Sequence, residues 1–185
     1  MKQQTIQITA DKAVERAKKL LSDVPGGAET ALMRAINRAT QSGKAQAVRE
    51  VRARYTVKVG DIRKTLTTTK ATRTSLEAEI VSRGSPLGLA SFKHAPKTDT
   101  TGNARKRVRV AVMKDGGLKP LGQAFVWQGK IMQRVGKTRL PVEKKIGPSV
   151  PSMIGNPEVV EAIESKTQEA VVTRLDHEVD RILKV

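Results

Sequence analysis

The sequence predicts an α+β fold with N-terminal helices, a small antiparallel β-sheet or half-barrel, and a C-terminal amphipathic helix. Three observations predict this class. Apolar residues recur at helical spacing near both ends of the chain, polar and apolar residues alternate with period two between them, and glycine- and proline-rich turns separate the alternating segments. The 185 residues are expected to form a single domain with a helical part (1–65), a β part (66–155) and a C-terminal helix (156–185).

Helical periodicity fills most of the first 65 residues. A first helix is predicted to begin after Thr9, its expected N-cap, and to end at the Val24-Pro25-Gly26-Gly27 turn. A longer helix is predicted over residues 28–55, and a short one over residues 59–64. Basic side chains crowd the polar faces of the long helix and form either a solvated surface or a contact surface: Arg34, Arg38, Lys44, Arg49, Arg52 and Arg54.

Short strands are predicted in the middle of the chain. Alternation over residues 76–80 indicates a half-buried strand that is broken at Gly84-Ser85-Pro86, and residues 87–92 are expected to form a second short extended piece. Residues 93–103 lack periodicity and are predicted to form a mobile loop. Residues 105–112 alternate basic and apolar side chains, which predicts a strand with one buried face and one cationic face.

The last third of the chain combines a hairpin, a proline-rich segment and a helix. Residues 123–128 and 130–135 are expected to pair as a hairpin through Gln128-Gly129. Residues 141–151 are bounded by prolines and are predicted to run irregularly over a surface without joining a sheet. The final helix is predicted to start with Asn156 as N-cap and Pro157 at its first position.

Composition restricts the possible functions. Aromatic residues are scarce, so the core must be built mainly from Val, Ile, Leu and Ala, which favours a domain stabilised by neighbouring subunits. The chain has no cysteine, and its two histidines, His94 and His177, are far apart, so neither a metal site nor a cofactor is expected. There is no apolar run of membrane-spanning length and no signal-peptide core, which predicts a protein made in a cytoplasm without membrane contact.

Catalytic patterns are missing from the sequence. It contains no Gly-x-Ser-x-Gly motif, and His177 stands between Asp176 and Glu178 on a charged helix face, as expected of a solvated residue. The carboxylates of the β part do not form an acid pair with recognisable spacing. We therefore expect no enzymatic activity, and a hydrolase of nucleic acid or cell wall is the weakest of the functions considered.

The net charge of +17 is unevenly distributed. Residues 34–73 contain eleven basic and two acidic residues, and residues 93–145 contain fourteen and three. Such a field attracts a polyanion or an acidic protein surface. On the alternating strand, four basic side chains are expected to face DNA: Arg105, Lys106, Arg107 and Arg109. Because aromatic stacking platforms are nearly missing, such contact would not read bases.

The segment from Ala124 to Met153 contains the most specific motifs: Arg134-x-Gly136-x-x-Arg139-Leu140-Pro141 and Gly147-Pro148-Ser149-Val150. With these motifs the chain resembles the prophage minor tail protein Z family, whose members are tail components of lambda-like bacteriophages. The resemblance covers most of the chain. Its carried-over positions are Gly84, Phe92, Phe125, Arg134, Gly136, Arg139, Leu140, Pro141, Gly147, Pro148 and Ser149.

This resemblance implies a non-enzymatic structural protein that acts in tail completion and head–tail joining, near the head-proximal end of the tail. It implies other phage tail and neck proteins as partners, such as the tail terminator, the tail tube and the head–tail connector. It also implies a homo-oligomer, with a hexameric ring as first choice by analogy with tails, and location in the virion tail after assembly in the host bacterial cytoplasm. Non-specific contact with phage DNA is expected from the positive charge.

The proline-rich segment is the candidate protein interface. A stiff arm with forked donors suits a fixed contact with the carboxylates of a neighbouring subunit. The residues expected there are Arg134, Gly136, Arg139, Pro141, Lys144, Lys145 and Pro148. A packed loop with intramolecular ion pairs is the alternative for this segment. For the whole chain, the alternative is a free-standing basic nucleic-acid-binding protein.

Overall fold

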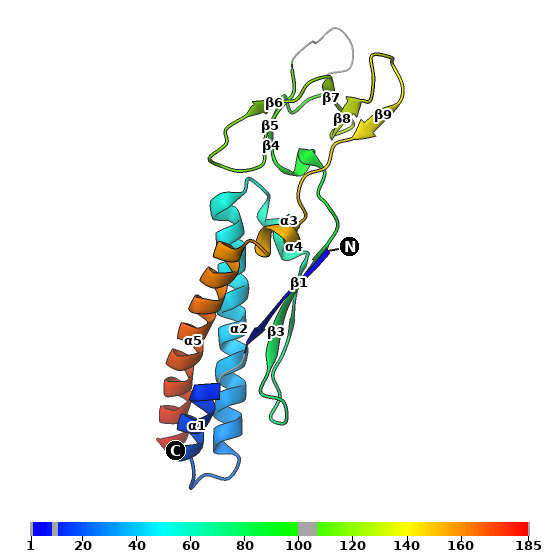
Figure 1. The fold of residues 1–185 in the computed structure, drawn as a ribbon. Helices are drawn as coiled ribbons and strands as arrows, with labels where there is room; N and C mark the ends of the chain where they lie inside the picture. The colour runs from blue at the N-terminus through cyan, green and yellow to red at the C-terminus, as the bar shows by residue number, and fades with distance from the viewer. Residues whose placement is uncertain (1, 9–10, 100–106, 185) are drawn as a thin grey trace.

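The computed structural model describes residues 2–8, 11–99 and 107–184, and it confirms the α+β class. Two parts lie end to end in Figure 1. In the lower part long helices lie beside a three-stranded sheet, and the upper part consists of two small three-stranded sheets. Organisation as one domain remains a prediction.

Two antiparallel helices, α2 (Gly27–Arg54) and α5 (Pro157–Leu183), form the long axis of the lower part (Figure 1). Helix α5 buries a side chain at every fourth position: Val159, Ile163, Thr167, Val171, Leu175 and Val179. Five of the eleven residues that helix α2 buries are alanines and two are glycines, and these small residues let the two backbones approach closely. Helix α1 (Asp11–Leu20) packs against α2 and α5 at the lower end of the molecule, where α2 begins and α5 ends (Figure 1). The predicted long helices are confirmed, whereas the expected N-cap Thr9 lies outside the described residues.

The C-terminal part contains two helices, α4 (Val150–Ile154) and α5, and each begins with a capping residue. Asn156 caps α5, since its side-chain oxygen accepts a hydrogen bond from the Glu158 N–H at 3.1 Å, and Pro157 is the first helical residue, as predicted. The preceding helix α4 was not predicted, because its prolines indicated extended chain. Pro151 lies in its first turn, where a missing N–H costs no helical hydrogen bond.

The sheet beside α2 has the order β1-β3-β2 and is antiparallel, with Ile6 opposite Ile80. Its strands are β1 (Lys2–Ile8), β2 (Leu66–Thr69) and β3 (Ala78–Gly84). The central strand β3 confirms the predicted strand, and α3 (Val59–Arg63) confirms the predicted short helix. The edge strand β1 has no counterpart among the predicted elements.

The upper part contains the sheets β4-β5-β6 and β7-β8-β9. Their strands are β4 (Lys93–Ala95), β5 (Arg109–Ala111), β6 (Lys119–Pro120), β7 (Ala124–Trp127), β8 (Lys130–Arg134) and β9 (Val142–Lys144). The predicted hairpin is confirmed as β7–β8. Gln128 and Gly129 have φ values of 47° and 69°, the left-handed values that a two-residue type I′ turn requires.

Two sequence predictions in this part are wrong. Residues 87–92 are not an extended piece, because Leu89–Ser91 forms a 3₁₀ helix (η1) in which the Phe92 N–H bonds the Leu89 carbonyl at 3.1 Å. This turn buries both Leu89 and Phe92, which lie three residues apart. Residues 93–103 are not all loop, since Lys93 pairs with Ala111 at the start of β4. The remainder of that prediction falls partly outside the described residues, as do Arg105 and Lys106.

Part of the proline-bounded segment 141–151 belongs to a sheet. The sequence predicts a segment that joins no sheet, but Val142–Lys144 forms β9 and pairs with β8, with Arg134 opposite Val142. The pairing is possible because Pro141 lies just before the strand and removes no backbone donor from the β-ladder.

No helix within the described ranges has the length and apolarity that a membrane crossing requires.

Candidate protein interface

A concavity of about 820 Å³ lies on the β7-β8-β9 sheet at the upper end of the molecule. It is formed where the 135–141 loop, which joins β8 to β9, stands beside β7. The lining residues are Gln123, Ala124, Phe125, Trp127, Arg134, Gly136, Lys137, Arg139, Leu140 and Val142. Three of the seven predicted interface residues, Arg134, Gly136 and Arg139, therefore meet at one surface feature.

The charge of this concavity is entirely positive. Arg134, Lys137 and Arg139 line it, and no carboxylate does. Within the part of the chain that the structure describes, none of these three cations lies within 4.0 Å of an acidic group. The alternative prediction, a loop held by its own ion pairs, therefore finds no support among the described residues.

Aromatic and aliphatic side chains accompany these cations. The Arg134 guanidinium carbon lies 6.0 Å from the centre of the Phe125 ring. This cation–π contact orients the guanidinium group and leaves its charge unneutralised. Trp127, Val135 and Leu140 leave 43%, 58% and 68% of their surface exposed. Tryptophan and arginine are enriched among the residues that contribute most to protein interfaces. The mixture is therefore typical of a protein-binding surface.

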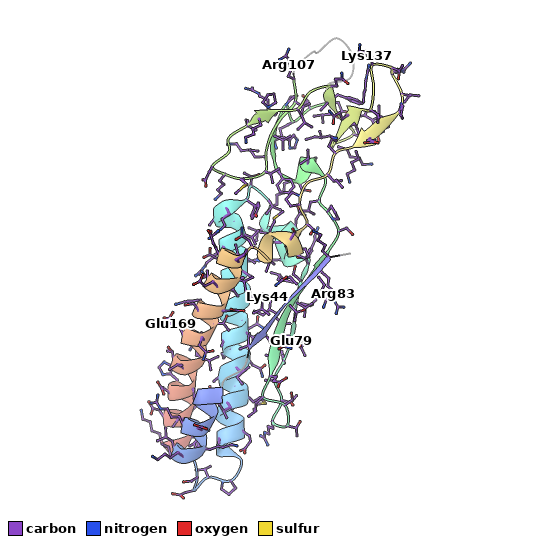
Figure 2. The ribbon with its side chains drawn as sticks, in the orientation of Figure 1. Lys44, Glu79, Arg83, Arg107, Lys137 and Glu169 are labelled. Carbon is purple, nitrogen blue, oxygen red and sulfur yellow. The ribbon has the colours of Figure 1, made fainter. Side chains whose placement is uncertain are left out.

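Hydrogen bonds close the loop that carries the two outer cations. The Val135 N–H bonds the Pro141 carbonyl at 3.1 Å across the neck of the loop. At its tip, the Thr138 hydroxyl donates to the Leu140 carbonyl at 2.6 Å. Figure 2 shows Lys137 at the extreme upper end of the molecule. These bonds limit the conformations of the loop, so a partner would meet a surface that is already shaped.

Three predicted interface residues lie elsewhere. Lys144 is exposed on β9, and its side chain lies over Gly88, where an added Cβ would come within 2.8 Å of the lysine Cε. The backbone of Lys145 bonds Ile131 at 2.9 Å and Leu89 at 3.0 Å. Pro148 accepts a long hydrogen bond, 3.5 Å, from the Leu87 N–H. These residues connect the sheet to the chain around η1 and do not line the concavity.

Pro141 closes the neck of the loop through its carbonyl and also lies outside the lining. Conversely, four residues that line the concavity were not among the interface residues predicted from the sequence: Phe125, Trp127, Lys137 and Leu140. Phe125 and Leu140 were among the positions carried over from the family resemblance. A signal for Trp127 was present, because it is the single tryptophan of the chain and directly precedes the hairpin turn.

The four residues predicted to face DNA can be placed only in part. Arg109 is exposed in β5, and Arg107 is exposed before that strand, near the upper end of the molecule in Figure 2. The strand is shorter than predicted and begins at Arg109. Arg105 and Lys106 lie outside the described residues.

Two features of the described residues bear on the class of protein. No three acidic, cysteine or histidine side chains gather there as a metal site. The concavity combines cationic, aromatic and exposed aliphatic side chains, a composition typical of proteins that bind other proteins.

The model of the family described as prophage minor tail protein Z (GPZ) matches residues 10–185, and the chain belongs to this family. The family gives the chain a structural role in a phage tail and a place in the virion, and it is not known for enzymatic activity. Neither the curated proteins nor the solved structures provide a match to this chain.

Proposed function

We propose that this chain completes the phage tail and joins it to the head, and that it does so through the concavity of Phe125, Trp127, Arg134 and Arg139. The observation that carries the proposal is the combination of free cations with exposed apolar side chains at one end of an elongated molecule. An acidic partner surface with an apolar centre would fit it. The head-proximal tail and neck proteins are the expected partners: the tail terminator, the tail tube and the head–tail connector.

The chain is proposed to act as a ring. Components that surround one tail axis are related by cyclic symmetry, and six copies is the expected number by analogy with tails. Six chains of net charge +17 would place on the order of a hundred positive charges around the axis, which neighbouring acidic surfaces or DNA must neutralise. Arg107 and Arg109 are proposed to make weak, sequence-independent contacts with the genome end. The tail role is preferred over a free-standing basic nucleic-acid-binding protein because the family match covers nearly the whole chain.

Imaging of complete phage particles tests this proposal. A particle map should show six copies around the axis where the tail meets the head. Cells that lack the chain should accumulate DNA-filled heads and separate tails. Density at the distal tail end, or one or two copies off the axis, would contradict the proposed position and symmetry.

A further inference from the structure

A second surface feature lies along α2 where the lower part of the molecule meets the upper part, away from the interface concavity. It is a groove of about 750 Å³ along α2, bounded by α3 and by the turn after β5. Five cations line it: Lys44, Arg49, Arg52, Arg63 and Lys114. The other lining side chains are small or uncharged, and no carboxylate is among them.

The five groove cations are unpaired within the described residues. None of them lies within 4.0 Å of an acidic group there. Other arginines of the same helix are paired, since Arg54 contacts Glu158 and Arg34 lies 3.4 Å from Glu178. Acidic residues of α5 thus neutralise part of α2 but not the groove, which keeps its full charge for a ligand.

The cationic surface continues beyond this groove. Gln41 lines both the groove and a second concavity of about 550 Å³, which contains Arg34, Arg38, Lys70 and Arg181 together with Glu178. From Arg38, the first of these helix cations without an ion pair among the described residues, to Arg52 the helix advances about 21 Å, at a rise of 1.5 Å per residue. One strand of duplex DNA carries about six phosphates over that length, at about 3.4 Å each. A straight helix with cations along this length matches an extended polyanion better than a single anion.

The lining distinguishes nucleic acid from an acidic protein. Protein interfaces contain central aromatic or large aliphatic anchors, as the Arg134 concavity does. None of the large exposed hydrophobic side chains of the described residues lines the α2 groove, which offers Ala45, Val48, Ala53 and Val59 as its apolar residues. Interfaces with DNA are more polar and more positive than those with protein. The composition of the groove corresponds to the DNA case.

We propose that the α2 groove binds the phosphate backbone of double-stranded DNA. Its arginines donate paired hydrogen bonds to phosphate oxygens, and Lys44 and Lys114 act as point charges. Contacts to phosphate oxygens carry no information about the bases, so this binding is independent of base sequence. This site is separate from the DNA contact proposed for Arg107 and Arg109, and it does not depend on the head–tail joining role.

Salt titration of DNA binding by the isolated full-length protein tests the site. The probe is a fluorescently labelled duplex, and anisotropy is measured between about 50 and about 200 mM salt. The triple variant Lys44→Gln, Arg52→Gln, Arg63→Gln should lower the slope of log K against log salt by about 2.7, from about 0.9 per lost phosphate contact. Its affinity at the lower salt should fall at least about tenfold.

The control variant removes the same charge elsewhere, by Arg134→Gln, Lys137→Gln and Arg139→Gln. It should retain the wild-type slope to within about one contact. Circular dichroism and thermal unfolding of both variants confirm that they are folded. Equal weakening by the two triples would overturn the site, because net charge alone would then account for binding.

Two other results would also overturn the site. One is no measurable DNA binding by the wild-type protein at the lower salt. The other is normal DNA binding by the groove variant, and if that variant also no longer enters tails, the groove would be assigned to a protein partner. DNA binding by the isolated protein is measured without heads or tails, so it does not depend on head–tail joining. The DNA site and the head–tail joining role can therefore be contradicted separately.

Discussion

Gly43 of α2 lies directly against Thr167 of α5, where the two long helices pack together. A Cβ added to Gly43 would overlap the Thr167 hydroxyl and would come within 2.9 Å of the Ile80 Cδ1 on β3. Thr167 is buried, and its hydroxyl donates to the Ile163 carbonyl at 2.7 Å. One missing side chain therefore allows α2, α5 and the central strand to meet.

Replacing Gly43 by alanine should destabilise the protein. Alanine is favoured over glycine inside a helix by about 1 kcal/mol, but overpacking of a buried contact costs about 1–3 kcal/mol. Because the added Cβ would overlap the Thr167 hydroxyl, the upper part of that range applies, about 2–3 kcal/mol. A net loss of about 1–2 kcal/mol in the free energy of unfolding is therefore expected from denaturant titration. Gly60→Ala in α3 is the control, since its Cβ would meet nothing within 4 Å. Equal stability of the Gly43→Ala variant and the wild type would show that the helices have room to separate.

Asn37 should be important for positioning the loop between β2 and β3. Its amide donates to the Ala71 carbonyl at 3.0 Å and accepts from the Ala71 N–H at 2.9 Å. Asn37→Ala removes both bonds and leaves two partly buried backbone groups without this partner, at a cost of about 1–3 kcal/mol. Hydrogen exchange at the Ala71 amide should accelerate, and unchanged exchange would contradict this role.

Trp127 should report directly on occupation of the interface concavity. It is the single tryptophan of the chain, it lines the concavity, and 43% of its surface is exposed. Its fluorescence emission should shift to shorter wavelength, and quenching by acrylamide should decrease, when purified protein is mixed with its tail or neck partner. Binding without either change would place the contact elsewhere, and Trp127→Phe provides the background signal.

Local sequence patterns predicted the elements whose signals are repeated or specific. Helix α5 follows from its capping residues and its repeated apolar positions, and the β7–β8 hairpin follows from Gln128-Gly129 between two short apolar runs. The edge strand β1 could not be found in this way, because Ile6 is paired with Ile80, far along the chain. Its pattern has meaning only beside the partner strand.

The candidate sites depended even more on long-range structure. Arg134, Gly136 and Arg139 belong to one motif, so the sequence could place them together. Lys137 and Trp127 join them because the loop closes through the hydrogen bond from Val135 to Pro141. In the same way, the basic face of α2 becomes a groove only when α3 and Lys114 are folded beside it.

Head–tail joining in vitro tests the central claim most directly. Tails that carry Arg134→Gln with Arg139→Gln are mixed with DNA-filled heads, and joined particles are counted by electron microscopy. Tails with Arg107→Gln and Arg109→Gln serve as the charge-matched control. The interface variant should enter tails in normal amount but give at least about tenfold fewer joined particles, as expected for loss of about 1.4 kcal/mol or more of contact energy. The control should join normally and show poor DNA retention or ejection. Joining at the wild-type level by the interface variant would contradict the assignment of this concavity to head–tail joining.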